Sequence, residues 1–183
     1  MSGFASVKGT ETIHARPQAF ITAFVRRVEG GLLSGTPSRR SNYLVTRKSA
    51  DGLEFRAVDW LTAFNVGLND VELTISPDGR TQFQIRYARW AGYALALGAA
   101  IGLAFIAIFL TFDIRGYIAR HPESRFGGLS TDQNVVLAWA MALFWAFIWP
   151  WLLILMHQRP LQRLMKRLIA EVDSTALEAG SYN

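Results

Sequence analysis

The stretch that decides the fold is Gln82–Gly98, QFQIRYARWAGYALALG. Its first half alternates polar and apolar residues with a period of two, which is typical of a β-strand with one face in water. Its second half carries no charge from Trp90 onward, and no glycine or proline separates the two patterns. We therefore expect a strand of a soluble domain that continues almost directly into a membrane-spanning helix.

Two long uncharged segments predict the membrane part of the chain. The first runs from Trp90 to Phe112 and the second from Val135 to Met156. In a helix that rises about 1.5 Å per residue, each segment is long enough to cross a hydrocarbon core of about 30 Å. Neither segment resembles a cleaved signal peptide, because both are too long and lie too far from the start. We predict transmembrane helices at residues 90–112 and 135–157, joined by an external loop at residues 113–134.

Positive charges beside these two helices indicate their orientation. Seven arginine and lysine residues flank the sides that lead to the chain ends, against three in the connecting loop. The positive-inside bias then favours a multi-pass protein of an inner or plasma membrane, with both termini in the cytoplasm. Arginine, lysine and aromatic side chains near the bilayer surface also contact headgroups. The residues predicted to lie at this membrane interface are Arg86, Arg89, Trp90, Tyr93, Arg159, Arg163, Lys166 and Arg167.

The residues before the first span predict a cytoplasmic α+β domain at positions 15–89, preceded by a flexible arm at positions 1–14. Pro17 begins an amphipathic helix with apolar residues at helical spacing. Two segments of period-two alternation, each with a glycine turn at its centre, then predict two β-hairpins. The fold class expected is a small helix on a four-stranded antiparallel sheet, followed by a transmembrane hairpin. The segment Asp59–Asn69 fits either a short helix or an irregular connection.

Small and aromatic residues in the two spans predict how the helices pack. Ala94, Gly98 and Gly102 recur every four residues and allow close approach of a helix, either the second span or another subunit. Pro150 should kink or loosen the second span, because it removes one backbone hydrogen bond. The aromatic residues around it are candidates for partner contact, although a lipid-facing position would also suit Trp145. They are Trp145, Trp149 and Trp151.

The last segment, residues 158–183, predicts a cytoplasmic amphipathic helix and tail. Leu161, Leu164, Leu168 and Val172 share one face, with basic residues at its sides. We expect this helix to lie in the cytoplasmic membrane interface, with docking on the soluble domain as the alternative.

No arrangement of residues typical of catalysis or metal binding is found in the sequence. The chain has no cysteine, and His14, His121 and His157 lack the spacing of a metal site. The polar residues Asp59, Asn65, Asn69 and Asp70 are interpreted as caps and turns. We predict no catalytic, cofactor-binding or metal-binding residue, no enzyme activity and no nucleic-acid partner.

The function expected is that of a non-catalytic accessory subunit that scaffolds or stabilises a larger membrane complex. Its partners would be the lipid bilayer and other integral membrane subunits. The alternative is a membrane-tethered sensor for a lipid or small apolar ligand. That role predicts a cavity between the helix of Phe20 and Phe24 and the sheet of Phe55, Leu73 and Ile85. An oligomeric channel is poorly supported, because the spans carry few polar residues.

Overall fold

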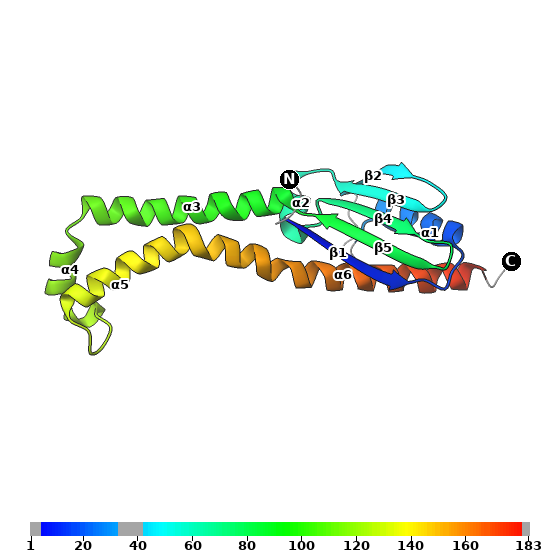
Figure 1. Cartoon of the computed structure of the whole chain (residues 1–183). Coiled ribbons are helices and arrows are strands. Elements are labelled where there is room, and N and C mark those ends of the chain that lie inside the picture. The colour runs from blue at the N-terminus through cyan, green and yellow to red at the C-terminus, as the bar shows by residue number, and fades with distance from the viewer. Residues whose placement is uncertain (1–4, 33–41, 181–183) are drawn as a thin grey trace. The chain divides into compact units, whose positions relative to one another are not determined.

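The computed structural model describes residues 5–32 and 42–180 of the chain. The chain divides into two compact units. The sheet unit contains the residues up to Ala91 and those from Met156 onward, and the hairpin unit contains Gly92–Leu155. Figure 1 shows the elements of both in chain order.

An antiparallel sheet of five strands forms the centre of the sheet unit, in the order β1-β5-β4-β3-β2. Both predicted hairpins are present. The polar sides of their strands are exposed on one face, and the apolar sides are buried under helices on the other. The strands are β1 Ser6–Thr12, β2 Tyr43–Lys48, β3 Gly52–Ala57, β4 Asp70–Ile75 and β5 Arg80–Arg86.

The fifth strand, β1, corrects the predictions of four strands and of a flexible arm at residues 1–14. It pairs with β5 from Ser6 opposite Arg86 to Thr12 opposite Arg80. Gly9 lies opposite Phe83, and a Cβ atom on it would be 2.3 Å from the Phe83 ring. Because the neighbouring strand supplies the bulk at this position, β1 itself needs little apolar character. Its sequence therefore lacks the alternation that identifies the other strands.

Two short elements complete the N-terminal part of the sheet unit. Helix α1, Pro17–Glu29, begins with the predicted proline, and Phe24 contacts Phe55 of the sheet with ring centroids 5.9 Å apart. Helix α2, Trp60–Val66, resolves the ambiguous segment in favour of a helix. Asp59 caps it, because the Asp59 carboxylate accepts a 2.7 Å hydrogen bond from the Thr62 amide.

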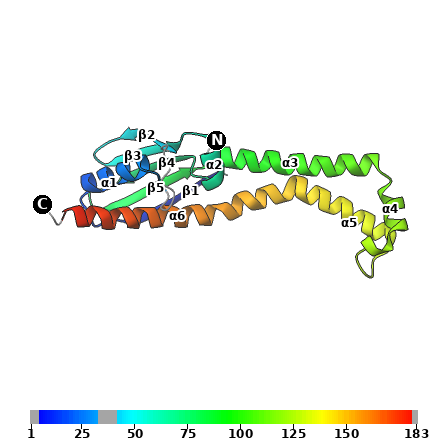
Figure 2. The ribbon, with the colours of Figure 1, turned by 180° about the vertical axis from the view of Figure 1, so that it is seen from behind.

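The C-terminal part of α6, Trp149–Gly180, packs on the sheet unit along β1, as Figures 1 and 2 show. Gln162 donates a hydrogen bond to the Lys8 carbonyl, and Lys166 forms an ion pair with Glu11. This differs from the interfacial position predicted for residues 158–183. The apolar face is covered by protein and is not available for lipid. It consists of Leu161, Met165, Leu168, Ile169, Val172 and Ala176.

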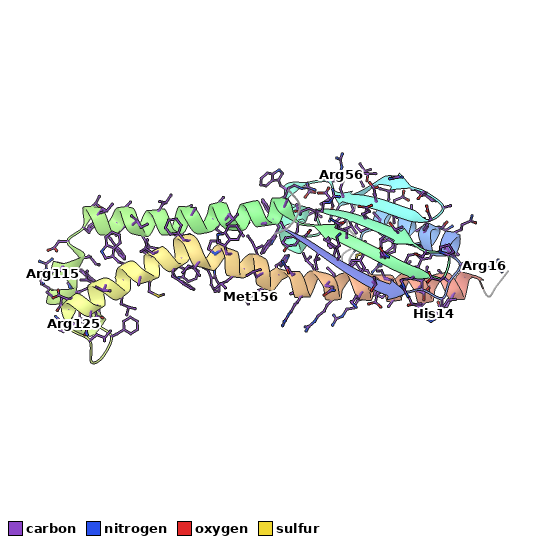
Figure 3. The ribbon with its side chains drawn as sticks, in the orientation of Figure 1. His14, Arg16, Arg56, Arg115, Arg125 and Met156 are labelled. Atoms are coloured by element: carbon purple, nitrogen blue, oxygen red, sulfur yellow. The ribbon has the colours of Figure 1, made fainter. Side chains whose placement is uncertain are left out.

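The hairpin unit consists of helices and the short connections between them. Ser130 and Gln133 form a capping box at the start of α5. Arg115 forms an ion pair of 2.8 Å with Asp132, and Arg125 donates to the carbonyls of α4 (Figure 3). The elements are α3 Ala88–Thr111, α4 Ile114–Arg120, η1 Pro122–Ser124, α5 Thr131–Leu143, the π-helix η2 Phe144–Ile148 and the beginning of α6.

Two of these helices, Ala88–Thr111 and the continuous helical segment from Thr131, are long and apolar enough to cross a membrane by length and composition. Most of their large apolar side chains lie on the outside. On α3 these include Tyr93, Leu97, Ile101, Leu103, Phe105, Ile108 and Leu110, and on the second segment Val136, Met141, Leu143, Phe147, Ile148, Trp151, Leu152 and Leu155.

Candidate functional site

The candidate site lies at the end of the sheet unit where β5 passes into α3. Tyr87 is the only residue between these two elements. The same end receives α6 at Met156, which is labelled in Figure 3. We call the residues of this site the junction cluster; they are Gly67, Asn69, Tyr87, Arg89, Trp90 and His157.

His157 is the residue at the centre of the cluster. Its ring stacks on that of Trp90, with centroids 3.9 Å apart and planes inclined by 7°. The Tyr87 ring meets His157 edge-on at 5.9 Å. The sequence placed Trp90 in an interfacial aromatic belt and did not predict this contact, because the two residues are far apart in the chain. The stack attaches the first turn of α3 to the part of α6 that belongs to the sheet unit.

Glycine is required opposite this stack. Gly67 ends α2 with φ of 76°, in the left-handed region, and a Cβ atom there would lie 2.2 Å from His157 Nε2. Burial raises the pKa of the Tyr87 hydroxyl, and a hydrogen bond with Gln158 opposes this shift. The aromatic rings thus fill the space between α2, α3 and α6 closely.

Arg89 binds protein carbonyls at this junction. Its guanidinium donates to the Ala57 carbonyl at 3.2 Å and to the Asn69 carbonyl at 3.1 Å. Asp70 lies 3.8 Å away and balances part of its charge. The prediction that Arg89 acts at the membrane interface is untested, but these donors are directed to the ends of β3 and β4. Arg89 therefore covers the ends of two inner strands, next to the point where α3 begins.

Asn69 joins α2 to α3 and is completely buried. Its side-chain amide donates to the Ala63 carbonyl in α2 at 3.0 Å, and its oxygen accepts the Trp90 amide at 3.1 Å. Asp59 caps α2, and hydrogen bonding from the Thr62 backbone lowers the Asp59 pKa. These contacts support the interpretation of the polar residues as caps; the side chain of Asn65 lies outside the described residues.

The other basic residues predicted at the membrane interface are spread over the sheet unit. Arg86 lies 3.8 Å from Glu72 on the open face of the sheet, and Lys166 pairs with Glu11 on β1. Arg159, Arg163 and Arg167 are exposed on the outer side of α6. The structure therefore gathers three of the predicted cations on one side of α6 and places Arg86 and Lys166 elsewhere on the sheet unit.

The small-residue strip packs inside the hairpin unit. A Cβ atom on Gly98 would lie 2.1 Å from Pro150, and one on Gly102 would lie 2.1 Å from the Ala146 Cβ. Ala94, in the same strip, is also buried. Of the two alternatives for this strip, packing against the second span of the same chain is the one observed.

The hydrogen bonding of the second span departs from the α-helical pattern just before Pro150, where we expected a kink or a loosening of the helix. Residues Phe144–Ile148 form a π-helix, in which the Trp149 amide bonds to the Phe144 carbonyl five residues earlier. Trp145 and Trp149 contact each other at 5.1 Å, whereas Trp151 is exposed to the outside. Trp145 thus has an aromatic neighbour within its own chain.

Comparisons with protein-family models, with curated proteins and with solved structures found no match for this chain. Among residues 5–32 and 42–180, no group of three or more histidine, aspartate or glutamate residues could hold a metal ion.

Proposed function

We propose that this chain is a non-catalytic integral membrane subunit that scaffolds or stabilises a larger membrane complex. The exposed apolar surface of the hairpin unit carries this proposal. In water such a surface would be costly at about 25 cal/mol per Å², whereas lipid or apolar partner helices remove the cost. The two helical segments also have the length and composition of membrane spans.

In this proposal the hairpin crosses an inner or plasma membrane, and both chain ends lie in the cytoplasm. The excess of positive charge beside the chain ends supports this orientation. A chain without cysteine allows a direct test, since single cysteines can be introduced one at a time. In intact cells, an impermeant maleimide should label Phe126→Cys in the outer loop and label Asp78→Cys only after lysis. The reverse pattern would overturn the orientation.

The difference between the two faces of the sheet supports the scaffolding role. Helices α1 and α6 cover the apolar face, while polar side chains along β4 and β5 are exposed on the opposite face. Such a surface suits hydrogen-bonded contact with another soluble domain, because most of its groups already tolerate water. The exposed residues on this face include Glu72, Thr74, Gln82 and Arg86.

The alternative role as a ligand sensor has less support. It required an apolar cavity between α1 and the sheet, but aromatic rings are in contact there. Phe20 contacts Phe24 at 5.6 Å, and both Phe24 and Tyr43 contact Phe55 at 5.9 Å. Phe20, Phe24 and Phe55 are at most 1% exposed. Space for a ligand would require these rings to separate.

Native mass spectrometry after extraction in a mild detergent tests the proposal. A stoichiometric complex with other membrane proteins is the expected result. A chain that leaves the membrane as a lone monomer, at detergent concentrations that preserve known complexes, would overturn the scaffolding role. A chain that is soluble without detergent would overturn membrane insertion as well.

A further inference from the structure

Helix α2 and the residues before it carry an exposed apolar ridge. Trp60 is 64% exposed, Leu61 73% and Val58 57%, although all three are large apolar side chains close together in sequence. The Trp60 ring has an edge contact at 4.8 Å with Phe64 on the same helix, and most of the rest of its surface faces outward. We call Val58, Trp60 and Leu61 the α2 ridge. Adjacent exposed apolar side chains of this size are typical of an interaction surface.

Hydrogen bonds attach this ridge to the beginning of α3. Arg89 in the first turn of α3 donates to carbonyls on both sides of α2, at Ala57 and at Asn69. The Asn69 side chain bonds simultaneously to Ala63 in α2 and to Trp90 in α3. Within the sheet unit, α2 therefore lies beside the first turn of α3 (Figure 1). That turn begins the helix that is apolar enough to cross a membrane.

We propose that the α2 ridge is a membrane-surface anchor that inserts Trp60 and Leu61 among the lipid headgroups beside the start of α3. The inference rests on the proposed function, because it requires α3 to enter the bilayer. Because α2 is held next to the point where α3 would enter the bilayer, it would contact the membrane surface without a further conformational change. Tryptophan suits this depth, since its ring is apolar and its indole N–H can bind headgroups.

The charged residues around the α2 ridge indicate that the anchor binds the apolar part of the lipid. Arg56, Arg86 and Arg89 lie near the ridge, but Asp59, Asp70 and Glu72 lie on the same end of the sheet. Each of these three cations has an acidic neighbour, so the ridge itself adds little to the attraction for anionic lipid that Arg159 and the other cations of α6 provide. Insertion of Trp60 and Leu61 should take place in zwitterionic as well as in anionic membranes.

Single-cysteine labelling of the full chain tests the anchor. The chain would be reconstituted into phosphatidylcholine vesicles that contain lipids with a quencher near the headgroup, and into a second set with a quencher deep in the acyl chains, which is the set used for Leu103→Cys. An environment-sensitive fluorophore is attached at Leu61→Cys. Leu177→Cys is the matched control, an exposed leucine near the C-terminal end of α6, and Leu103→Cys on the outside of α3 reports membrane insertion itself.

The expected result is a blue-shifted emission and loss of most of the fluorescence at Leu61→Cys, with little change at Leu177→Cys. The additional substitution Trp60→Ser should reduce the quenching at position 61. If Leu61→Cys behaves like Leu177→Cys while Leu103→Cys is quenched, the anchor is overturned and membrane insertion stands; the ridge is then left to a protein partner. If Leu103→Cys is not quenched either, the proposed membrane location fails together with the anchor.

Discussion

The two units place the same kinds of side chain in opposite environments. In the sheet unit, Phe24 and Phe55 are completely covered, whereas in the hairpin unit Phe147 and Leu103 face outward. Polar contacts of Arg89 and Asn69 also join the ends of two inner strands to α2 and α3 in the sheet unit. Apolar residues therefore stabilise the sheet unit by leaving water. The hairpin unit leaves the same kinds of side chain exposed on its own helices, and in the proposed function lipid or partner helices cover them.

The largest expected effect comes from a buried phenylalanine of the sheet unit. Phe24→Ala should destabilise that unit by about 3–5 kcal/mol, because it removes the contact with Phe55 and leaves a cavity. The matched change in the hairpin unit, Phe147→Ala at a side chain 60% exposed, should have little effect on either unit. Hydrogen exchange in detergent measures the difference, with the β5 amides reporting on the sheet unit and the α3 amides after Gly92 reporting on the hairpin unit. Equal effects would contradict the contrast between the units.

The aromatic stack of the junction cluster gives the next largest effect. Gly67→Ala should cost about 1–2 kcal/mol for left-handed backbone strain and about 1–3 kcal/mol for crowding against His157. The crowding should be relieved in the double variant Gly67→Ala, His157→Ala, while the strain remains. A double-mutant cycle on thermal unfolding therefore separates the two costs. Additive effects would show that the His157 ring does not crowd the methyl group that Gly67→Ala introduces.

The docking of α6 on the sheet unit can be weakened at one carboxylate. Asp173 is nearly buried and accepts hydrogen bonds from the amides of His14 and Ala15 at 2.9–3.0 Å. Asp173→Asn should cost about 1.5–3 kcal/mol, because one acceptor oxygen and the charge are lost. The control on the same helix is Glu171→Gln, whose exposed ion pair with Arg27 at 3.4 Å should contribute at most about 1 kcal/mol.

Limited proteolysis of the C-terminal segment is the measurement. Faster cleavage in Asp173→Asn than in Glu171→Gln is expected, because only the first variant loses buried hydrogen bonds. Equal rates would indicate that the apolar face alone holds α6 in place.

Close helix packing in the hairpin unit allows a comparison between two glycines of α3. Gly102→Leu should destabilise the hairpin by about 1–3 kcal/mol, because the new side chain would collide with Ala146. Gly92→Leu has open space around its Cβ position and should be tolerated. Both changes add the same apolar volume, so thermal unfolding in detergent isolates the effect of packing. A similar loss for Gly92→Leu would contradict internal packing of the strip.

Local sequence patterns predicted the helices and strands. What each apolar face packs against was predicted less well. The alternation of polar and apolar residues identified both hairpins, and Pro17 identified the start of α1. Strand β1 was missed because Gly9 contributes no side chain and Phe83 fills its place. The amphipathic pattern of residues 158–183 was recognised, but an apolar face looks the same whether protein or lipid covers it. His157 was missed because its contact with Trp90 depends on the tertiary fold.

The smallest effect expected concerns the cap of α2, which holds the ridge at the end of the sheet unit. Hydrogen bonds from the Thr62 backbone lower the Asp59 pKa in the folded chain below its ordinary value. The cap therefore contributes its full stabilisation above the ordinary aspartate pKa of about 3.9 and loses it as the pH falls through the lower, folded-state value. Asp59→Asn keeps a cap that does not titrate. The protection of the Ala63 amide against hydrogen exchange, relative to its intrinsic rate at the same pH, should fall below that pH in the parent chain but not in the variant. An equal loss of protection in both would assign the acid sensitivity to another carboxylate.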